Sequence, residues 1–192
     1  MTSWNVCTEV LLDEHGKSMK ITIPASMTFS SILRDLIWSL IQNDTQFSSK
    51  WKHRIQLMAD ELINNAIEHG SAPWNIVKIT LTISNNSDFE IIIEDSWTGK
   101  KQINANELMD FVKASREAMT VNPLSNKSIR WRWLAMIVLN WSDDFKYENN
   151  STWWLTARMC KKFTQDCWEK DLKKLNENAS IKNQIKVEAL VF

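Results

Sequence analysis

The chain of 192 residues has little glycine and little cysteine, with three residues of each. Soluble domains average about 7% glycine, which would be roughly 13 residues at this length. The cysteines, Cys7, Cys160 and Cys167, form no CxxC pair and have no histidine near them in the sequence. This pattern argues against a cysteine-based metal site and fits a reducing cytoplasm.

Net charge and long apolar runs are also lacking. The formal net charge is zero, so no overall electrostatic field points to a nucleic acid or a membrane surface. The longest wholly apolar run is Leu134 to Leu139, and the N-terminus has no charged segment followed by an apolar core. We therefore expect no transmembrane helix and no signal peptide.

Tryptophan, by contrast, is abundant, with 11 residues. The 3 glycines and 11 tryptophans together make 14, close to a normal glycine quota. Several stand where a bulky aromatic is out of place: Trp153 and Trp154 interrupt a predicted strand, and Trp131 and Trp133 flank an arginine at a predicted helix start. Some bacterial lineages reassign the UGA codon to glycine. We hypothesise that many of these tryptophans are glycines in the native protein; the alternative is a genuinely tryptophan-rich chain with an aromatic binding face.

The stretch from Asp60 to Gly70 lies in an apolar-periodic run that predicts a helix over about 52–69. The residues on its predicted buried face recur at three- and four-residue steps: Ile55, Met58, Ala59, Leu62, Ile63 and Ala66. Glu61 and Asn65 are four apart and share one edge of this helix, and His69 continues the row. A carboxylate and a carboxamide at this spacing suit a hard cation such as Mg²⁺ and one water. The same pair also fits the wet edge of an ordinary amphipathic helix.

The other elements are predicted from periodicity and turn residues. In chain order they are strands at 4–12 and 17–24, a helix capped by Thr28 or Ser30 and ending near Gln42, strands at 75–84 and 88–95, a polar lid-like segment at 96–130 with a helix from Ala105 to Met119, a helix at 132–140, strands at 143–148 and 153–159, and a helical tail from Gln165. The buried face of the first helix is expected to hold Ile32, Leu33, Leu36, Ile37, Leu40 and Ile41. The run from Ile91 to Ile93 predicts a strand buried on both faces. The tail would either contact a partner or fold back on the domain.

Two further stretches carry candidate chemistry. The sequence Asp95-Ser96-Trp97-Thr98-Gly99 follows the Ile91–Ile93 strand. Its carboxylate can accept a hydrogen bond from an exocyclic amine while a glycine turn closes around a flat ring, although a strand-ending Asx turn is a common alternative. The sequence from Arg130 to Ile137 is RWRWLAMI, or RGRGLAMI with glycines. Glycines at a helix start let backbone N–H groups approach a polyphosphate, whereas two indoles would fill that space.

In their order and spacing these stretches resemble the ATPase domain of the Bergerat-fold (GHKL) superfamily, most closely the bacterial anti-sigma-factor serine/threonine kinases. The resemblance runs from about Met19 to about Met159. It is carried by Ile21–Ala25 at the opening strand, Glu61–Gly70 as the N box, Asp95–Gly99 as the first glycine box and Arg130–Ile137 as the second.

This resemblance implies an α/β fold. It would be a two-layer sandwich of a mixed, mostly antiparallel sheet with helices on one face. An ATP-binding domain would occupy 1–164, with a helical tail at 165–192. The family's lid corresponds to 100–130, and ATP with Mg²⁺ would lie between this lid and the boxes.

The site residues follow from the same resemblance. Glu61 is similar to the family's general base, Asn65 to its Mg²⁺ ligand and Asp95 to its adenine-binding carboxylate. The other implied nucleotide-binding residues are His69, Trp97, Gly99, Arg130, Trp131, Arg132, Trp133 and Leu134. Trp97, Trp131 and Trp133 stand where the family has glycine, and Leu155 replaces a small polar residue on the last strand.

The implied function is that of a cytoplasmic, ATP- and Mg²⁺-dependent serine/threonine protein kinase. It would phosphorylate an anti-anti-sigma antagonist and control a sigma factor, with no direct nucleic-acid or membrane partner. Relatives often dimerise, so a homodimer is compatible with the resemblance.

Two alternatives remain open. The first is a regulatory module that binds partners without phosphoryl transfer, free of nucleotide if Trp97, Trp131 and Trp133 are genuine. The second is the ATPase half of a histidine kinase. Against the second, no dimerisation helix with a phospho-accepting histidine precedes the N box, since His53 is too close to it and His15 lies in a predicted turn.

Overall fold

The structure, a computed structural model, describes residues 6–96, 98, 99, 104–121, 138, 140–149, 154–165 and 167. Its strands are β1 (Cys7–Asp13), β2 (Gly16–Pro24), β3 (Ile76–Ser84), β4 (Phe89–Asp95), β5 (Asp144–Asn149) and β6 (Leu155–Lys161). Its helices are a short 3₁₀ turn η1 (Met27–Phe29), α1 (Ser30–Asp44), α2 (Ser49–Asn65), a π-helical turn η2 (Ala66–Gly70) and α3 (Ala105–Val121).

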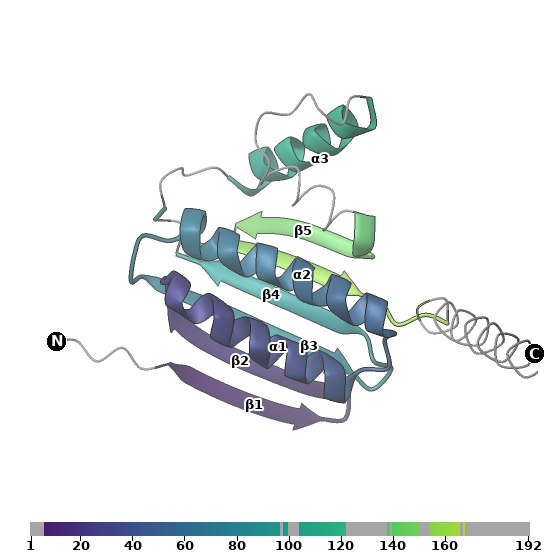
Figure 1. The fold of residues 1–192 in the computed structure, drawn as a ribbon. Coiled ribbons are helices and arrows are strands. Elements are labelled where there is room, and N and C mark those ends of the chain that lie inside the picture. Colours follow the sequence, from purple (N-terminus) through teal and green to yellow (C-terminus); the bar gives the residue numbers. More distant parts are fainter. Residues whose placement is uncertain are drawn as a thin grey trace, which may run out of the picture.

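The strands form one six-stranded sheet in the order β1-β2-β3-β4-β6-β5. All five pairings are antiparallel, so the part of the chain that is described holds no parallel pair, although a mixed sheet was predicted. Helices α1 and α2 lie side by side over one face of this sheet (Figure 1). The protein is therefore an α/β structure with two layers, as the sequence predicted.

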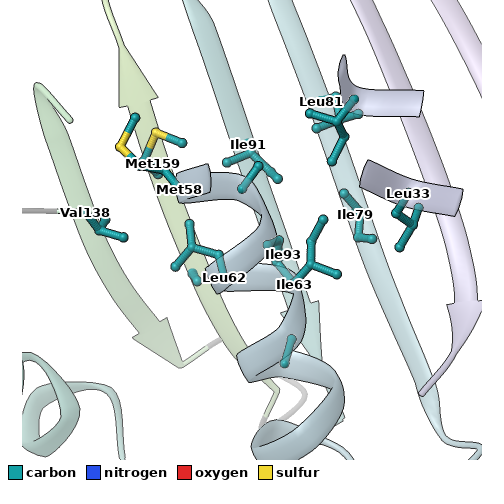
Figure 2. Close-up of a cluster of buried hydrophobic side chains, with 14 of the residues drawn as sticks. Leu33, Met58, Leu62, Ile63, Ile79, Leu81, Ile91, Ile93, Val138 and Met159 are labelled. Atoms are coloured by element: carbon teal, nitrogen blue, oxygen red, sulfur yellow. The ribbon is translucent and has the colours of Figure 1, made fainter. Parts of the chain in front are cut away.

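The core lies between α2 and the central strands. Every residue predicted for the buried face of α2 is at most 5% exposed, which confirms the periodicity argument. Figure 2 shows Met58, Leu62 and Ile63 of α2 among side chains from β4 and β6, including Ile93 and Met159. Burial of these apolar side chains fixes α2 on the sheet, at about 1.5–3 kcal/mol for each fully buried one.

Two burial predictions were wrong. Ile91 and Ile93 are buried but Ile92 between them is only half-buried, because α1 and α2 cover one face of the sheet. Ile32 is 63% exposed rather than buried. It lies two residues, or about 200°, around α1 from Arg34, whose side chain points to α2 and bonds Asp60. Ile32 therefore points away from the neighbouring helix.

Some predicted boundaries also differ. No side chain caps α1, which follows directly from η1 with Phe29 at its N-cap position, so neither Thr28 nor Ser30 is the predicted cap. Strand β6 begins at Leu155, so Trp154 precedes the strand and does not interrupt it.

Several predictions lie outside the described residues. These are the second glycine box at 130–137, most of the predicted lid outside α3, most of the helix at 132–140, and the tail at 165–192 apart from Gln165 and Cys167. The domain boundary at 164 therefore stays a prediction. In the described part of the chain, no helix is long and apolar enough to cross a membrane.

Candidate functional site

Glu61 and Asn65 lie at the edge of the helix that carries the core. Both side chains are half-buried, whereas Leu62 and Ile63 between them are buried. Helix α2 ends at Asn65 and the chain continues through the π-helical turn η2 to Gly70. Single π turns inside or after α-helices are often found at functional sites. The helix therefore carries a carboxylate and a carboxamide to the rim of the core, as their four-residue spacing predicted.

Asp95, the last residue of β4, lies against the end of this helical segment. It lies on the same helix-covered face of the sheet as Ile91 and Ile93 and is only 5% exposed. A Cβ atom on Gly70 would lie 2.0 Å from Asp95 Oδ2, far inside contact distance. Only glycine at position 70 lets the carboxylate occupy this place.

The loop after β4 packs on the same point. The backbone N–H groups of Thr98 and Gly99 lie 3.1 and 3.3 Å from the carbonyl oxygen of Gly70, to which they donate. A Cβ on Gly99 would lie 1.7 Å from the carbonyl oxygen of His69. The structure thus brings Asp95 and Gly99 of the predicted first glycine box against His69 and Gly70 of the predicted N box.

Thr98 is a site residue that the sequence analysis did not single out. Its hydroxyl oxygen accepts hydrogen bonds from the Ala72 backbone N–H (3.0 Å) and the Asn75 side-chain amide (2.6 Å), and it lies 2.8 Å from the Ser96 hydroxyl. The Ser96 N–H in turn donates to the Ser71 hydroxyl at 3.2 Å. A small hydroxyl residue inside a predicted binding loop was the available signal. These bonds hold the loop after β4 against the segment after η2.

Tyr147 of β5 is a second residue that was missed. It is opposite Ala157 of β6, which is opposite Ile93 of β4, so it lies on the helix-covered face two strands from Asp95. Its burial, and secondarily the negative charge of Asp95, raises its pKa above the usual value of 10. Asp95 is therefore close enough for its charge to act on this phenol.

The neighbours of Glu61 and Asn65 tie α2 to α1. Asp60 is 9% exposed and accepts a 2.6 Å hydrogen bond from Arg34. Its pKa is raised by burial, and the Arg34 hydrogen bond and charge oppose this shift. Ser30 donates to the Asn64 side chain at 2.7 Å. These contacts limit rotation of α2 and so hold the edge that carries Glu61 and Asn65.

The tryptophans differ in how well they suit their positions. Trp74 has a φ of 68°, in the left-handed region that glycine favours, and its side chain is 50% exposed. Trp51 and Trp141 instead pack against the core, and their rings lie 4.8 and 4.9 Å from the Arg54 guanidinium. The backbone thus supports a native glycine at position 74, whereas glycine at 51 or 141 would remove core contacts. Trp97, Trp131, Trp133 and Trp153 lie outside the described residues.

A surface hollow of about 500 Å³ lies at the other end of the sheet. It is lined by residues that include Gly16, Asp44 and Asn85 and by none of the predicted site residues. Among the described residues, no three or more His, Cys, Asp or Glu side chains form a metal-binding cluster. Mg²⁺ usually binds through one or two protein groups together with substrate phosphates, as a site at Asn65 would require.

The predicted site is therefore half described. Glu61 and Asn65 lie on α2, His69 on η2, Asp95 at the end of β4 and Gly99 in the loop that follows. Asp95 and Gly99 meet His69 and Gly70, while Glu61 and Asn65 lie up to one or two turns earlier on the same helical segment. Arg130, Trp131, Arg132, Trp133 and Leu134, the predicted phosphate-facing residues, lie outside the described part of the chain. A scan against protein-family models finds no match to this chain, and a search of the curated proteins finds none either.

Proposed function

We propose that this two-layer structure is a Bergerat-type ATPase domain and that its native form is an ATP-dependent serine/threonine protein kinase of the anti-sigma type. The observation that carries the proposal is the contact of Asp95 and Gly99 with His69 and Gly70. Two sequence stretches that resemble separate nucleotide-binding boxes meet there. They do so through glycine positions where any side chain would collide with a carboxylate or a carbonyl group.

The described residues fit ATP and Mg²⁺. Asp95 is a buried carboxylate at the end of a strand, suited to accept a hydrogen bond from an exocyclic amine such as that of adenine. Asn65 has an amide oxygen of the hard type that Mg²⁺ prefers. Mg²⁺–ATP, when bound, would supply the transferable phosphoryl group and neutralise its charge. In this proposal, Asp95 would form part of the wall of the base-binding region, held there by the close backbone approach at Gly70 and Gly99.

Glu61 is the proposed general base. It lies one helical turn before Asn65 on the same edge of α2, so a hydroxyl group placed next to the phosphates could transfer its proton to this carboxylate. The bonds from Arg34 to Asp60 and from Ser30 to Asn64 hold α2 in position. Positioning and charge neutralisation provide most of the catalysis in phosphoryl transfer, so a rigid helix suits this role.

The proposal is tested first by nucleotide binding. Two full-length proteins are compared, one as written and one with glycine at positions 74, 97, 131, 133, 153 and 154. We expect the glycine form to bind a fluorescent ATP analogue with Mg²⁺ and the written form to bind it much more weakly. In the glycine form, Asp95→Ala should weaken binding about tenfold or more, while the exposed Asp144→Ala should not.

Phosphoryl transfer is tested with ATP labelled at the γ-phosphate in an extract of the source organism. The glycine form should label a protein, and Glu61→Gln should abolish labelling while leaving ATP binding intact. ATP binding without any labelled product would instead support the partner-binding module. No ATP binding by a folded glycine form would refute the proposal.

A further inference from the structure

The hollow at the end of the sheet away from the candidate site is formed by three segments. Figure 1 shows them at one end of the molecule: the turn between β1 and β2, the end of α1, and the turn between β3 and β4. The two turns are tied together, because the Asn85 backbone N–H donates to the His15 carbonyl oxygen at 3.1 Å and its side-chain amide donates to the Glu14 carbonyl oxygen at 2.7 Å. The volume of about 500 Å³ is typical of a small-molecule site.

Ser87, in the turn between β3 and β4, lines this hollow and is unusual in two respects. Its φ of 67° lies in the left-handed region that glycine favours. It is also only 5% exposed, yet its side-chain hydroxyl has no hydrogen-bond partner among the described residues. Residues held in such a sparsely populated backbone conformation occur most often at active sites and ligand-binding sites.

The hydroxyl group of Ser87 opens into the hollow. In the part of the chain that the structure describes, no fully buried side-chain nitrogen or oxygen atom lacks a hydrogen-bond partner. The Ser87 oxygen has no partner, so it must reach the surface, and the hollow is the surface that Ser87 lines. An unpaired polar group at a site this buried costs stability, whereas a ligand in the hollow would supply the missing hydrogen bond.

The charged groups that line the hollow carry a net negative charge. They are two carboxylates, Asp13 and Asp44, and one ammonium group, that of Lys17. Lys17 Nζ lies 2.6 Å from Asp44 Oδ2, and Asp13 Oδ1 accepts the backbone N–H groups of His15 and Gly16 at 2.8 and 3.0 Å. The other oxygen of each carboxylate has no partner among the described residues. Asp44 is also the last residue of α1, where the helix dipole favours a positive charge.

We propose that this hollow binds a small molecule with a primary ammonium group at the end of an aliphatic chain. An ammonium group has three N–H donors, which match in number the open oxygens of Asp13 and Asp44 and the hydroxyl oxygen of Ser87. Leu12, which is 77% exposed and also lines the hollow, would contact the aliphatic chain. The nearby Lys52 bonds the carbonyl oxygen at the end of α1 and does not line the hollow. The proposal does not depend on nucleotide binding.

Three probes of similar length test the class of ligand. Diaminopentane, pentanediol and glutarate carry ammonium, hydroxyl and carboxylate groups at the two ends of a short aliphatic chain. Each is titrated into the isotope-labelled full-length protein and followed by two-dimensional NMR of the backbone amides. We expect diaminopentane to bind with a Kd of roughly 1 mM, a typical affinity for a ligand this small. It should shift the amide signals of the segments 13–17, 43–46 and 84–87, and the other two probes should not.

Two variants with matched controls test the residues. Asp44→Asn keeps the shape of the side chain but removes its charge, and should raise the Kd for diaminopentane at least about tenfold. Asp35→Asn, at an exposed position of the same helix, should leave the Kd unchanged. Ser87→Gly removes the hydroxyl group and the backbone strain, so it should raise the Tm by about 1–4 °C while raising the Kd about fivefold. Asn86→Gly, at an exposed position of the same turn and outside the hollow, should leave the Kd unchanged.

Four results would overturn the proposal. Equal binding of pentanediol or glutarate would show that the hollow does not select an ammonium group. Shifts spread over the whole surface without saturation would show only non-specific attraction between charges. An unchanged Kd in both Asp44→Asn and Ser87→Gly would place the ligand elsewhere. The absence of any saturable shift up to about 20 mM diaminopentane, well above the expected Kd, would show that the hollow does not bind this class of molecule.

Discussion

The φ of Trp74 leads to a prediction that compares glycine with alanine at two tryptophan positions. Trp74 has a φ of 68°, whereas Trp38 lies in the middle of α1. Replacing each by alanine and by glycine removes the indole in all four variants, so the difference between the two variants at one position reports the backbone alone. We expect this difference to have opposite signs at 74 and 38.

The magnitudes follow from backbone energetics. An L-residue in the left-handed region costs roughly 1–2 kcal/mol, and glycine in its place loses about 0.5–1 kcal/mol more chain entropy on folding. Trp74→Gly should therefore be more stable than Trp74→Ala by about 0.5–1 kcal/mol. At Trp38 the helix favours alanine over glycine by about 1 kcal/mol. The two differences should be separated by about 1.5–2 kcal/mol.

Urea denaturation followed by circular dichroism measures these differences, from shifts in the midpoint at constant slope. At this chain length, 1 kcal/mol corresponds to about 2–4 °C in Tm, so thermal melting checks the result. If Trp74→Ala is as stable as Trp74→Gly, the backbone at position 74 does not need glycine. The structural argument for a glycine at that position would then be refuted. Reading the codon at position 74 gives an independent answer, with UGA supporting glycine and UGG opposing it.

Two further predictions follow from shifted pKa values. Tyr147 is the only tyrosine of the chain, so tyrosinate absorbance reports its titration alone. Because its pKa in the folded protein lies above the unfolded value of 10, the free energy of unfolding should fall as pH rises above about 10. Tyr147→Phe should make this fall, measured by urea denaturation, less steep. A native protein whose tyrosine titrates near 10 would contradict this. The pKa of Asp60 is also raised, chiefly by burial, and Arg34 opposes this shift. The free energy of unfolding should therefore fall as pH rises from the pKa of Asp60 in the unfolded chain, about 4, through its pKa in the folded protein. Arg34→Met should steepen this loss, and adding Asp60→Asn should remove it; equal pH profiles for the single variant and the original protein would show that Arg34 does not influence this carboxyl.

The sequence alone was sufficient to predict the elements with strong local patterns. The three- and four-residue spacing of apolar residues identified the buried face of α2, because one helix face repeats at this period whatever it packs against. The polar residues between predicted strands likewise marked the antiparallel pairs β1–β2, β3–β4 and β5–β6. Glu61 and Asn65 were placed on one edge of α2 for the same local reason, and in the structure both are half-buried.

Predictions that depended on neighbouring elements were less successful. Three consecutive isoleucines in β4 suggested a strand buried on both faces, and Ile32 was assigned to the core. Neither assignment is correct: Ile92 faces the side of the sheet opposite α1 and α2, and Ile32 lies on the side of α1 that points away from α2. A local pattern indicates that a residue is apolar but does not show whether another layer is present to cover it.

The arrangement of the candidate site depended on tertiary structure. Gly70 and Asp95 are far apart in sequence, and their contact exists because β4 ends beside the turn that follows α2. The hydrogen bonds of Thr98, the proximity of Tyr147 to Asp95 and the φ of Trp74 have no local sequence signal of comparable strength. They depend on how segments that are far apart in the sequence meet at one end of the sheet. There the backbone of one segment passes so close to another that a side chain at Gly70 or Gly99 would collide with it.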